Sequence, residues 1–266
     1  DSVPGIIISG NEKSTLTLPT NKLRVWGVQG FDSINTYKNF CKTATRLLKP
    51  ENIFLATKTV INESLHGRPG PSWLEIPINI QNQLIEKKDL KKHNKKNYQK
   101  KLTKQKKNNL NRINMKSILK LIENSKRPLF IFGNGCRSVD KKKIEKLINK
   151  LKFPFLLTWS SADLIDHDNK YFYGKSGVYG ERSSNFILQN SDLLITIGTR
   201  LSLLQIGYDV QQFAPKAKII MIDIDKKELI KFKEKRFLKI NADANYFINI
   251  LISKNIKPKK IILNNW

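Results

Sequence analysis

The sequence is poor in cysteine and contains no long apolar run. Its 266 residues include only Cys41 and Cys136, which excludes a disulfide framework and offers no metal-ligand spacing. No stretch is long and apolar enough to cross a bilayer, and no charged-then-apolar leader opens the chain. These absences predict a soluble cytoplasmic protein, or a piece of one, without a membrane partner.

Acidic residues are also scarce. The chain has 22 Asp and Glu against 49 Lys and Arg, so its formal net charge is +27. A charge of this size commonly indicates a nucleic-acid partner, and residues 86–112 would carry that function. Lysine dominates, however, without the interleaved arginine and aromatic residues of a base-stacking surface. We therefore expect a compositional bias on solvated faces and do not expect nucleic acid as a partner.

Common catalytic motifs are missing as well. The sequence has no GxxxxGK[ST] phosphate loop and no full GxGxxG, and spacing supports no Ser/His/Asp or Cys/His arrangement. Asp166, His167 and Asp168 together look like a metal-binding cluster, but adjacent loop residues seldom all face one ion. A polar loop is the favoured interpretation, and no metal site is expected.

What the chain does contain is an alternation of apolar runs and helical patterns. This alternation predicts an α/β fold, with a doubly wound parallel sheet (Rossmann-like) forming a domain at 113–255. The expected strands cover residues 127–133, 153–158, 171–174, 192–198, 218–224 and 237–241. The expected helices lie within residues 113–122, 144–151, 185–189, 225–233 and 246–252.

A shorter α/β pattern precedes this domain. Apolar runs at 5–9 and 72–78 predict strands, the first of them buried, and Pro50 opens a predicted helix. Two strands are too few for a complete sheet, because their edges would be exposed. We therefore expect only a partial domain at 1–85. The predicted linkers are the lysine-rich residues 86–112, with an anion-binding tether as the alternative, and residues 256–266, the start of another linker.

Glycines and charged side chains follow several predicted strands. Gly133 and Gly135 follow one strand, Gly177 opens a second glycine loop, Arg200 follows the central strand, and Asp223 ends the next one. Because the carboxyl ends of parallel strands meet at one edge, these groups could converge on a nucleotide-like ligand. Arg200 would take a phosphate and Asp223 a ribose hydroxyl.

A structural interpretation of these residues stays open. Tight turns also need glycine, and Asp223 or Asp225 could cap the following helix while Arg200 pairs with one of them. The strand at 153–158 ends in Thr158 and not in a ribose-binding acid, which disfavours a standard NAD site.

Three stretches together resemble the thiamine diphosphate-dependent enzymes of the acetolactate synthase group. DSVPGIIISG at 1–10, with Gln29 and HGRPGPSWLEIPINIQ at 66–81, resembles the second half of the family's pyrimidine-binding domain. RPLFIFGNG at 127–135 resembles the opening of the central domain, and residues 177–225 resemble its interior. The order and spacing of these stretches agree with the family over nearly the whole chain.

The resemblance implies a decarboxylating carboligase that acts on a 2-keto acid such as pyruvate. In that family, thiamine diphosphate with Mg²⁺ supplies the chemistry and lies between two subunits, which implies a homodimer or tetramer. Gln29 matches a family glutamine and is the one catalytic candidate. Acetolactate synthases also bind FAD in the central domain, so FAD is an optional cofactor; its candidate contacts here are Gly133, Gly135, Gly177, Arg200 and Asp223.

The chain also departs from the family pattern. The family's catalytic glutamate lies upstream of the matched segment, and no GDG of the magnesium motif occurs in the sequence. Gly30 follows Gln29 where an acid is usual, and Arg46 follows Thr45 where a lysine is common. The resemblance therefore implies a fragment that is inactive by itself, with a non-catalytic nucleotide- or FAD-binding module as the alternative.

Overall fold

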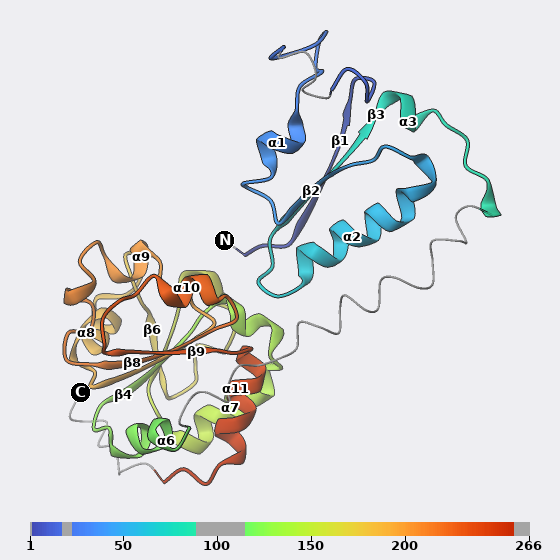
Figure 1. The fold of residues 1–266 in the computed structure, drawn as a ribbon. Coiled ribbons are helices and arrows are strands. Elements are labelled where there is room, and N and C mark those ends of the chain that lie inside the picture. The colour runs from blue at the N-terminus through green and yellow to red at the C-terminus, as the bar shows by residue number, and fades with distance from the viewer. Residues whose placement is uncertain (1, 18–22, 89–114, 258–266) are drawn as a thin grey trace. The chain divides into compact units, whose positions relative to one another are not determined.

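The computed structural model describes residues 2–17, 23–88 and 115–257 (Figure 1). Its chain divides into two compact units, the first ending at Lys107 and the second beginning at Asn108. Most of the predicted linker at 86–112, and most of the segment at 256–266, lie outside the described residues. The domain boundaries that the sequence suggested therefore stay predictions.

The first unit is built on a three-stranded parallel sheet with the order β1-β3-β2. Strands β1 and β3 match the two predicted strands. The second strand along the chain, β2, was not predicted, because its sequence Thr-Ala-Thr-Arg has no apolar alternation. The elements are β1 Gly5–Asn11, α1 Ser33–Tyr37, β2 Thr43–Arg46, the 3₁₀ helix η2 Pro50–Asn52, α2 Ile53–Leu65, β3 Pro71–Pro77 and α3 Ile78–Gln81.

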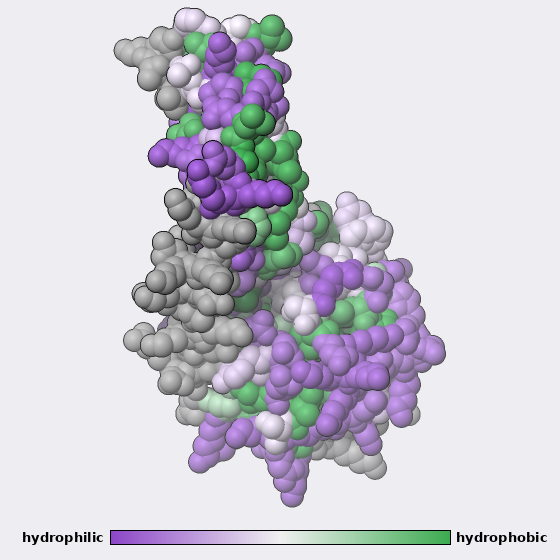
Figure 2. Space-filling model, turned by 90° about the vertical axis from the view of Figure 1, so that its right-hand side faces the viewer, coloured by the Kyte–Doolittle hydropathy of each residue, from purple (hydrophilic) through white to green (hydrophobic). Residues whose placement is uncertain are grey.

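The prediction that the first strand is buried was wrong. Within β1, Ile6, Ile7 and Ile8 are 41%, 37% and 63% exposed. The strand lies at the edge of the described sheet and pairs with β3 alone. Figure 2 shows hydrophobic residues at the surface of this unit. Strands of parallel sheets are normally covered on both faces, so β1 has the composition of an interior strand in the position of an edge strand.

The second unit is built on a six-stranded sheet with the order β6-β5-β4-β7-β8-β9, in which every pair is parallel. This is the doubly wound arrangement that the sequence predicted. Every residue of β4 and β7 is buried, as expected for central strands. The strands are β4 Pro128–Phe132, β5 Phe155–Leu157, β6 Phe172–Lys175, β7 Leu193–Ile197, β8 Lys218–Asp223 and β9 Phe237–Asn241.

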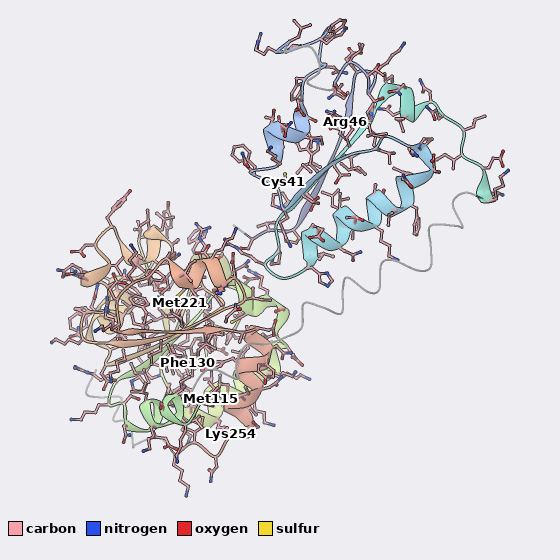
Figure 3. All side chains as sticks on the ribbon, viewed as in Figure 1. Cys41, Arg46, Met115, Phe130, Met221 and Lys254 are labelled. Carbon is pink, nitrogen blue, oxygen red and sulfur yellow. The ribbon has the colours of Figure 1, made fainter. Side chains whose placement is uncertain are left out.

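Helices cover both faces of this sheet. One core joins side chains such as Phe130 to α6, α7 and α11, and the other joins side chains such as Met221 to α8, α9 and α10 (Figure 3). The helices are α6 Met115–Asn124, α7 Lys141–Leu151, α8 Arg182–Asn190, α9 Leu203–Ile206, α10 Lys226–Ile230 and α11 Ala244–Ser253, with 3₁₀ helices η5 Asn134–Ser138, η6 Trp159–Ser161 and η7 Val210–Gln212.

Capping side chains fix the starts of several helices. Asp140 accepts a hydrogen bond from the Lys142 amide at the start of α7, and Asp243 accepts from the Asn245 and Tyr246 amides at the start of α11. The four-residue α9 was not predicted, since its sequence carries only one turn of helical pattern. Among helices in the described residues, none is long and apolar enough to span a membrane.

Candidate functional site

The first candidate site lies where the strand order reverses in the second sheet. Strands β4 and β7 are neighbours, although β5 and β6 separate them in the chain. Such a switch point is where open α/β sheets bind ligands. The Gly133 amide donates to the Ile197 carbonyl, and the Gly135 amide donates to the Gly198 carbonyl, both at 2.9 Å. The loops after β4 and β7 thus meet, as the sequence suggested.

Close backbone packing explains the glycines in these loops. A Cβ on Gly133 would lie 2.4 Å from the Gly198 carbonyl oxygen, and a Cβ on Gly135 would lie 2.8 Å from the Gly198 Cα. The amides of Gly133 and Gly135 already donate to carbonyls, so they are not the free donors that a phosphate cradle requires. These two amides are therefore engaged and offer no free donor to the pyrophosphate of FAD, while other contacts of the two glycines with a ligand stay a prediction.

Cys136 follows the same glycine loop and is fully buried. Its thiol donates to the Ile197 carbonyl oxygen at 3.2 Å. Burial raises the pKa of the Cys136 thiol to about 12. A thiol held neutral in this way is a packing group and not a nucleophile.

The loop after β6 reaches the same edge of the sheet. Gly177, with a φ of +96°, exchanges two hydrogen bonds of 2.9 Å with the side chain of Asn185 on α8. The Val178 amide donates to the Leu204 carbonyl on α9 at 2.8 Å. A Cβ on Gly177 would lie 2.6 Å from that carbonyl oxygen, so close packing also favours glycine here.

The two charged candidates also lie at this edge. Arg200 is exposed, whereas Asp223 is only 8% exposed and its carboxylate accepts the Asp225 amide at 2.8 Å. Asp225 caps α10 by accepting from the Lys227 amide at 2.9 Å, which confirms the capping interpretation for that residue. The ligand contacts of Arg200 and Asp223 stay predictions.

Two exposed aromatic side chains that were not predicted as site residues lie at the same edge. Trp159 follows β5 and Tyr179 follows β6, and their ring centroids lie 5.4 Å apart. The two ring planes are tilted by 49° to each other, and the side chains are 67% and 58% exposed. The available signal was an aromatic residue directly after an apolar strand, where solvent exposure is costly.

The acidic tripeptide around His167 forms a polar loop, as favoured from the sequence. The His167 Nε2 atom lies 2.7 Å from the Ala162 carbonyl, and its ring stacks on Phe172. Asp166 pairs with Lys141 at 2.7 Å. Among the described residues, no group of three or more His, Cys, Asp or Glu is placed to hold a metal ion.

The second candidate site is the exposed Gln29 in the first unit. It lies on a tight hairpin in which the Trp26 and Gly30 amides donate to each other's carbonyls at 2.7 and 2.9 Å. A Cβ on Gly30 would lie 2.4 Å from the Trp26 carbonyl oxygen, so the hairpin requires glycine at that position. An acid after Gln29 would not fit this turn.

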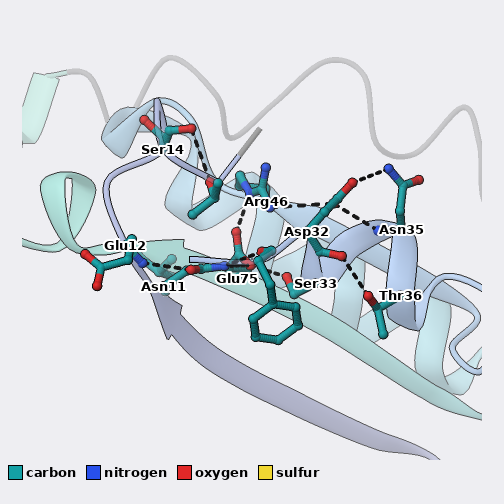
Figure 4. Close-up of polar contacts among 12 residues, drawn as sticks. Asn11, Glu12, Ser14, Asp32, Ser33, Asn35, Thr36, Arg46 and Glu75 are labelled. Atoms are coloured by element: carbon teal, nitrogen blue, oxygen red, sulfur yellow. Dashed lines mark hydrogen bonds and ion pairs between the residues drawn. The ribbon is translucent and has the colours of Figure 1, made fainter. Parts of the chain in front are cut away.

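A buried charge that was not predicted from the sequence lies close to this hairpin. Glu75 on β3 is 0% exposed and pairs with Arg46, the last residue of β2 (Figure 4). Asn11 also donates to the Glu75 carboxylate, at 2.6 Å. The signal in the sequence was an acid inside the apolar run WLEIP, since a buried carboxylate requires partners.

Comparison with known proteins assigns the family. The family model described as "Thiamine pyrophosphate enzyme, central domain" matches residues 115–251, just over half of the chain. The chain belongs to this family. The match covers the second unit from α6 to α11, which confirms the resemblance and its Rossmann-like fold.

Individual relatives extend the match into the first unit. The chain is 27% identical over 255 residues to the acetolactate synthase isozyme 1 large subunit of Escherichia coli, covering 95% of this chain and 42% of that protein. It is 28% identical over 273 residues to a probable acetolactate synthase large subunit of Methanocaldococcus jannaschii, covering 98% and 43%. It is 30% identical over 235 residues to the acetolactate synthase large subunit of Corynebacterium glutamicum, covering 88% and 36%. The chain thus spans less than half the length of these relatives.

Proposed function

We propose that this chain is part of a thiamine diphosphate-dependent 2-keto acid decarboxylase and carboligase of the acetolactate synthase type. The observation that carries the proposal is a collinear match of both units to acetolactate synthase large subunits, over 95% of this chain in the Escherichia coli case. A stand-alone nucleotide-binding module has no support, because that match does not stop at the second unit.

The proposal includes further chain beyond these 266 residues. The relatives are more than twice as long as the matched segment. The exposed isoleucines of β1 support this, since a parallel strand of that composition is expected to have a neighbour and covering helices. Segments that complete the first sheet would also bring the catalytic glutamate and the magnesium motif that the family resemblance implies.

When bound, thiamine diphosphate would supply the decarboxylating and carbon–carbon bond-forming chemistry. Of the described residues, Gln29 is the one proposed to contact the reacting groups, and its exposed position on a rigid hairpin suits an amide that orients a substrate carbonyl. Mg²⁺, the homodimer or tetramer and the cytoplasmic location belong to the same proposal. Light scattering of the longer protein tests the assembly, and cell fractionation tests the location.

The second unit is proposed to act as a scaffold without a bound flavin. The amides of Gly133 and Gly135 are engaged by the carbonyls of Ile197 and Gly198, which leaves no cradle for a pyrophosphate in that loop. We expect the purified chain to show no flavin absorbance, even after incubation with FAD and gel filtration. Retention of one FAD per chain would show that the loop opens to bind it.

Activity of the longer protein tests the function. The protein that contains this segment is expected to convert pyruvate to acetolactate only with added thiamine diphosphate and Mg²⁺, while the 266-residue chain is expected to be inactive. A Gln29→Ala variant of the longer protein should lose at least about tenfold in kcat, because the proposed orienting group is removed. No acetolactate from the cofactor-loaded longer protein would overturn the proposal.

A further inference from the structure

Four buried or partly buried side chains meet at the carboxyl edge of the first sheet. We call them the Glu75 cluster: Asn11, Ser33, Arg46 and Glu75 (Figure 4). Asn11 ends β1, Arg46 ends β2, Glu75 lies near the end of β3, and Ser33 begins α1. The cluster therefore ties every strand of the described sheet to the segment that follows the Gln29 hairpin.

Glu75 receives a donor from each of these neighbours. Its Oε1 atom accepts from the Arg46 Nε, and its Oε2 atom accepts from the Ser33 hydroxyl and from the Asn11 amide. The side chain of Arg46 is itself only 8% exposed. Hydrogen bonds from these partners offset the cost of burying the carboxylate, and loss of Arg46 would leave it without its oppositely charged partner.

The cluster also holds the backbone next to Gln29. The Asn11 side chain that binds Glu75 also donates to the Phe31 carbonyl at 3.1 Å. The Arg46 Nη2 atom lies 3.8 Å from the Asp32 carboxylate. Asp32 and Ser33 thus contact the buried ion pair directly, and Phe31 is joined to it through Asn11. The Gly30 amide, one residue earlier, closes the hairpin that carries Gln29.

We propose that Glu75 and Arg46 are positioning residues that fix residues 26–33, and through them the Gln29 side chain, at the carboxyl edge of the first sheet. This inference rests on the proposed function for the catalytic role of Gln29. The fixing of residues 26–33 by the ion pair does not depend on that function. The ion pair does not contact the reacting groups. It defines where the hairpin lies relative to the ends of the strands.

A purely structural pair would act differently from a positioning pair. Its loss would destabilise the first unit as a whole, so α2 and the hairpin would loosen together. Loss of a positioning pair releases the hairpin first, because the hairpin depends on the cluster through Asn11 and Ser33. Helix α2 contributes only Val60 and Ser64 to the buried residues and no member of the cluster. Local hydrogen exchange therefore separates the two roles.

The test combines hydrogen exchange with kinetics. In the longer protein, where the proposed further chain completes the first sheet, Glu75→Gln is expected to speed exchange of the Trp26 and Gly30 amides by about tenfold or more, with the α2 amides unchanged. Ser33→Ala, which removes one donor and keeps the charge pair, should give a smaller effect in the same segment. Glu63→Gln, on the exposed side of α2, is the matched control and should leave the hairpin unchanged.

The longer protein also supplies the kinetic arm. Glu75→Gln and Arg46→Ala should each lower kcat by about tenfold or more with little change in KM, whereas Arg46→Lys should keep most of the activity because the charge opposite Glu75 is kept. Unchanged hairpin exchange in both Glu75→Gln and Ser33→Ala, or equal loosening of α2, would overturn the positioning role. If the wild-type protein lacked carboligase activity, the proposed function would be wrong, but the exchange result would still test the positioning role.

Discussion

At the residue scale, close backbone packing accounts for the glycines in the loops after β4 and β7. The glycines let two loops approach closely enough for the Gly133 and Gly135 amides to donate to the carbonyls of Ile197 and Gly198. The sequence alone could not distinguish this use from a phosphate cradle, because both need a missing Cβ after a strand. The two uses of glycine can be told apart only from the partner loop, which lies more than sixty positions after Gly133 in the chain.

Gly133→Ala should therefore destabilise the second unit. The new Cβ would collide with the Gly198 carbonyl and with Thr199, and overpacking of this kind costs about 1–3 kcal/mol or more. Urea unfolding followed by circular dichroism measures the loss. Gly5→Ala is the control: nothing lies within 4 Å of its new Cβ, so it should change stability by less than about 0.5 kcal/mol. Equal effects of the two substitutions would contradict the packing explanation.

The buried thiol of Cys136 predicts a loss of stability in alkali. Its pKa is raised by burial from 9.0 to about 12, so the folded state keeps the proton longer than the unfolded state does. The contribution of the neutral thiol to the free energy of unfolding is fully present at pH values below the pKa of the unfolded state. It then falls by about 1.4 kcal/mol per pH unit as the pH rises toward the folded value. Denaturant midpoints measured near pH 8 and pH 10 should show a steeper decline for the wild type than for Cys136→Ala. Parallel declines would rule the thiol out as the cause.

At the element scale, aspartates cap the starts of α7, α10 and α11 in the second unit. Asp140, Asp225 and Asp243 each accept a hydrogen bond from an amide of the first turn. The cap at Asp225 was one of two interpretations open from the sequence. The geometry settles it, because the carboxylate reaches the amide two residues ahead.

Asp243→Ala should weaken α11, whose inner face packs into the main core. Two amides, of Asn245 and Tyr246, would lose their acceptor, and such caps contribute about 1 kcal/mol. The free energy of unfolding measures this loss. Asp168→Ala changes an exposed acid in a loop and should be nearly neutral. A neutral Asp243→Ala would show that packing alone fixes the start of α11.

Strands with strong local signals were predictable, and elements that depend on distant partners were not. The strand at β9 has the bounds Phe237–Asn241 that its apolar run predicted. The short β2 and the Glu75 cluster were missed. The cluster joins residues 64, 42 and 29 positions apart in the chain, so no local window contains it. Local periodicity reports which face of an element is apolar, but not which side chains it will meet.

At the scale of the whole molecule, the two units differ in how much core they contain. The second unit has a core on each face of its sheet. In the described part of the first unit, the buried hydrophobic residues are Leu47, Val60, Leu74 and Ile80. A three-stranded sheet with so small a core is marginal by itself.

The units should therefore differ in independent stability. A chain of residues 113–257 is expected to unfold cooperatively, because it carries both cores and the family match. A chain of residues 1–88 is expected to lack a cooperative transition, because β1 exposes its isoleucines. Thermal unfolding by circular dichroism checks both. A cooperative transition of residues 1–88 would show that β1 is stable without a further neighbouring strand.

The central claim is that this chain supplies one part of a thiamine diphosphate-dependent carboligase. Sequencing the messenger RNA across both ends of the segment tests it most directly. We predict a continuous reading frame, with a glutamate-bearing half-domain upstream of Asp1 and a GDG…NN domain downstream of Trp266. A start codon directly before Asp1 and a stop codon directly after Trp266 would contradict the account.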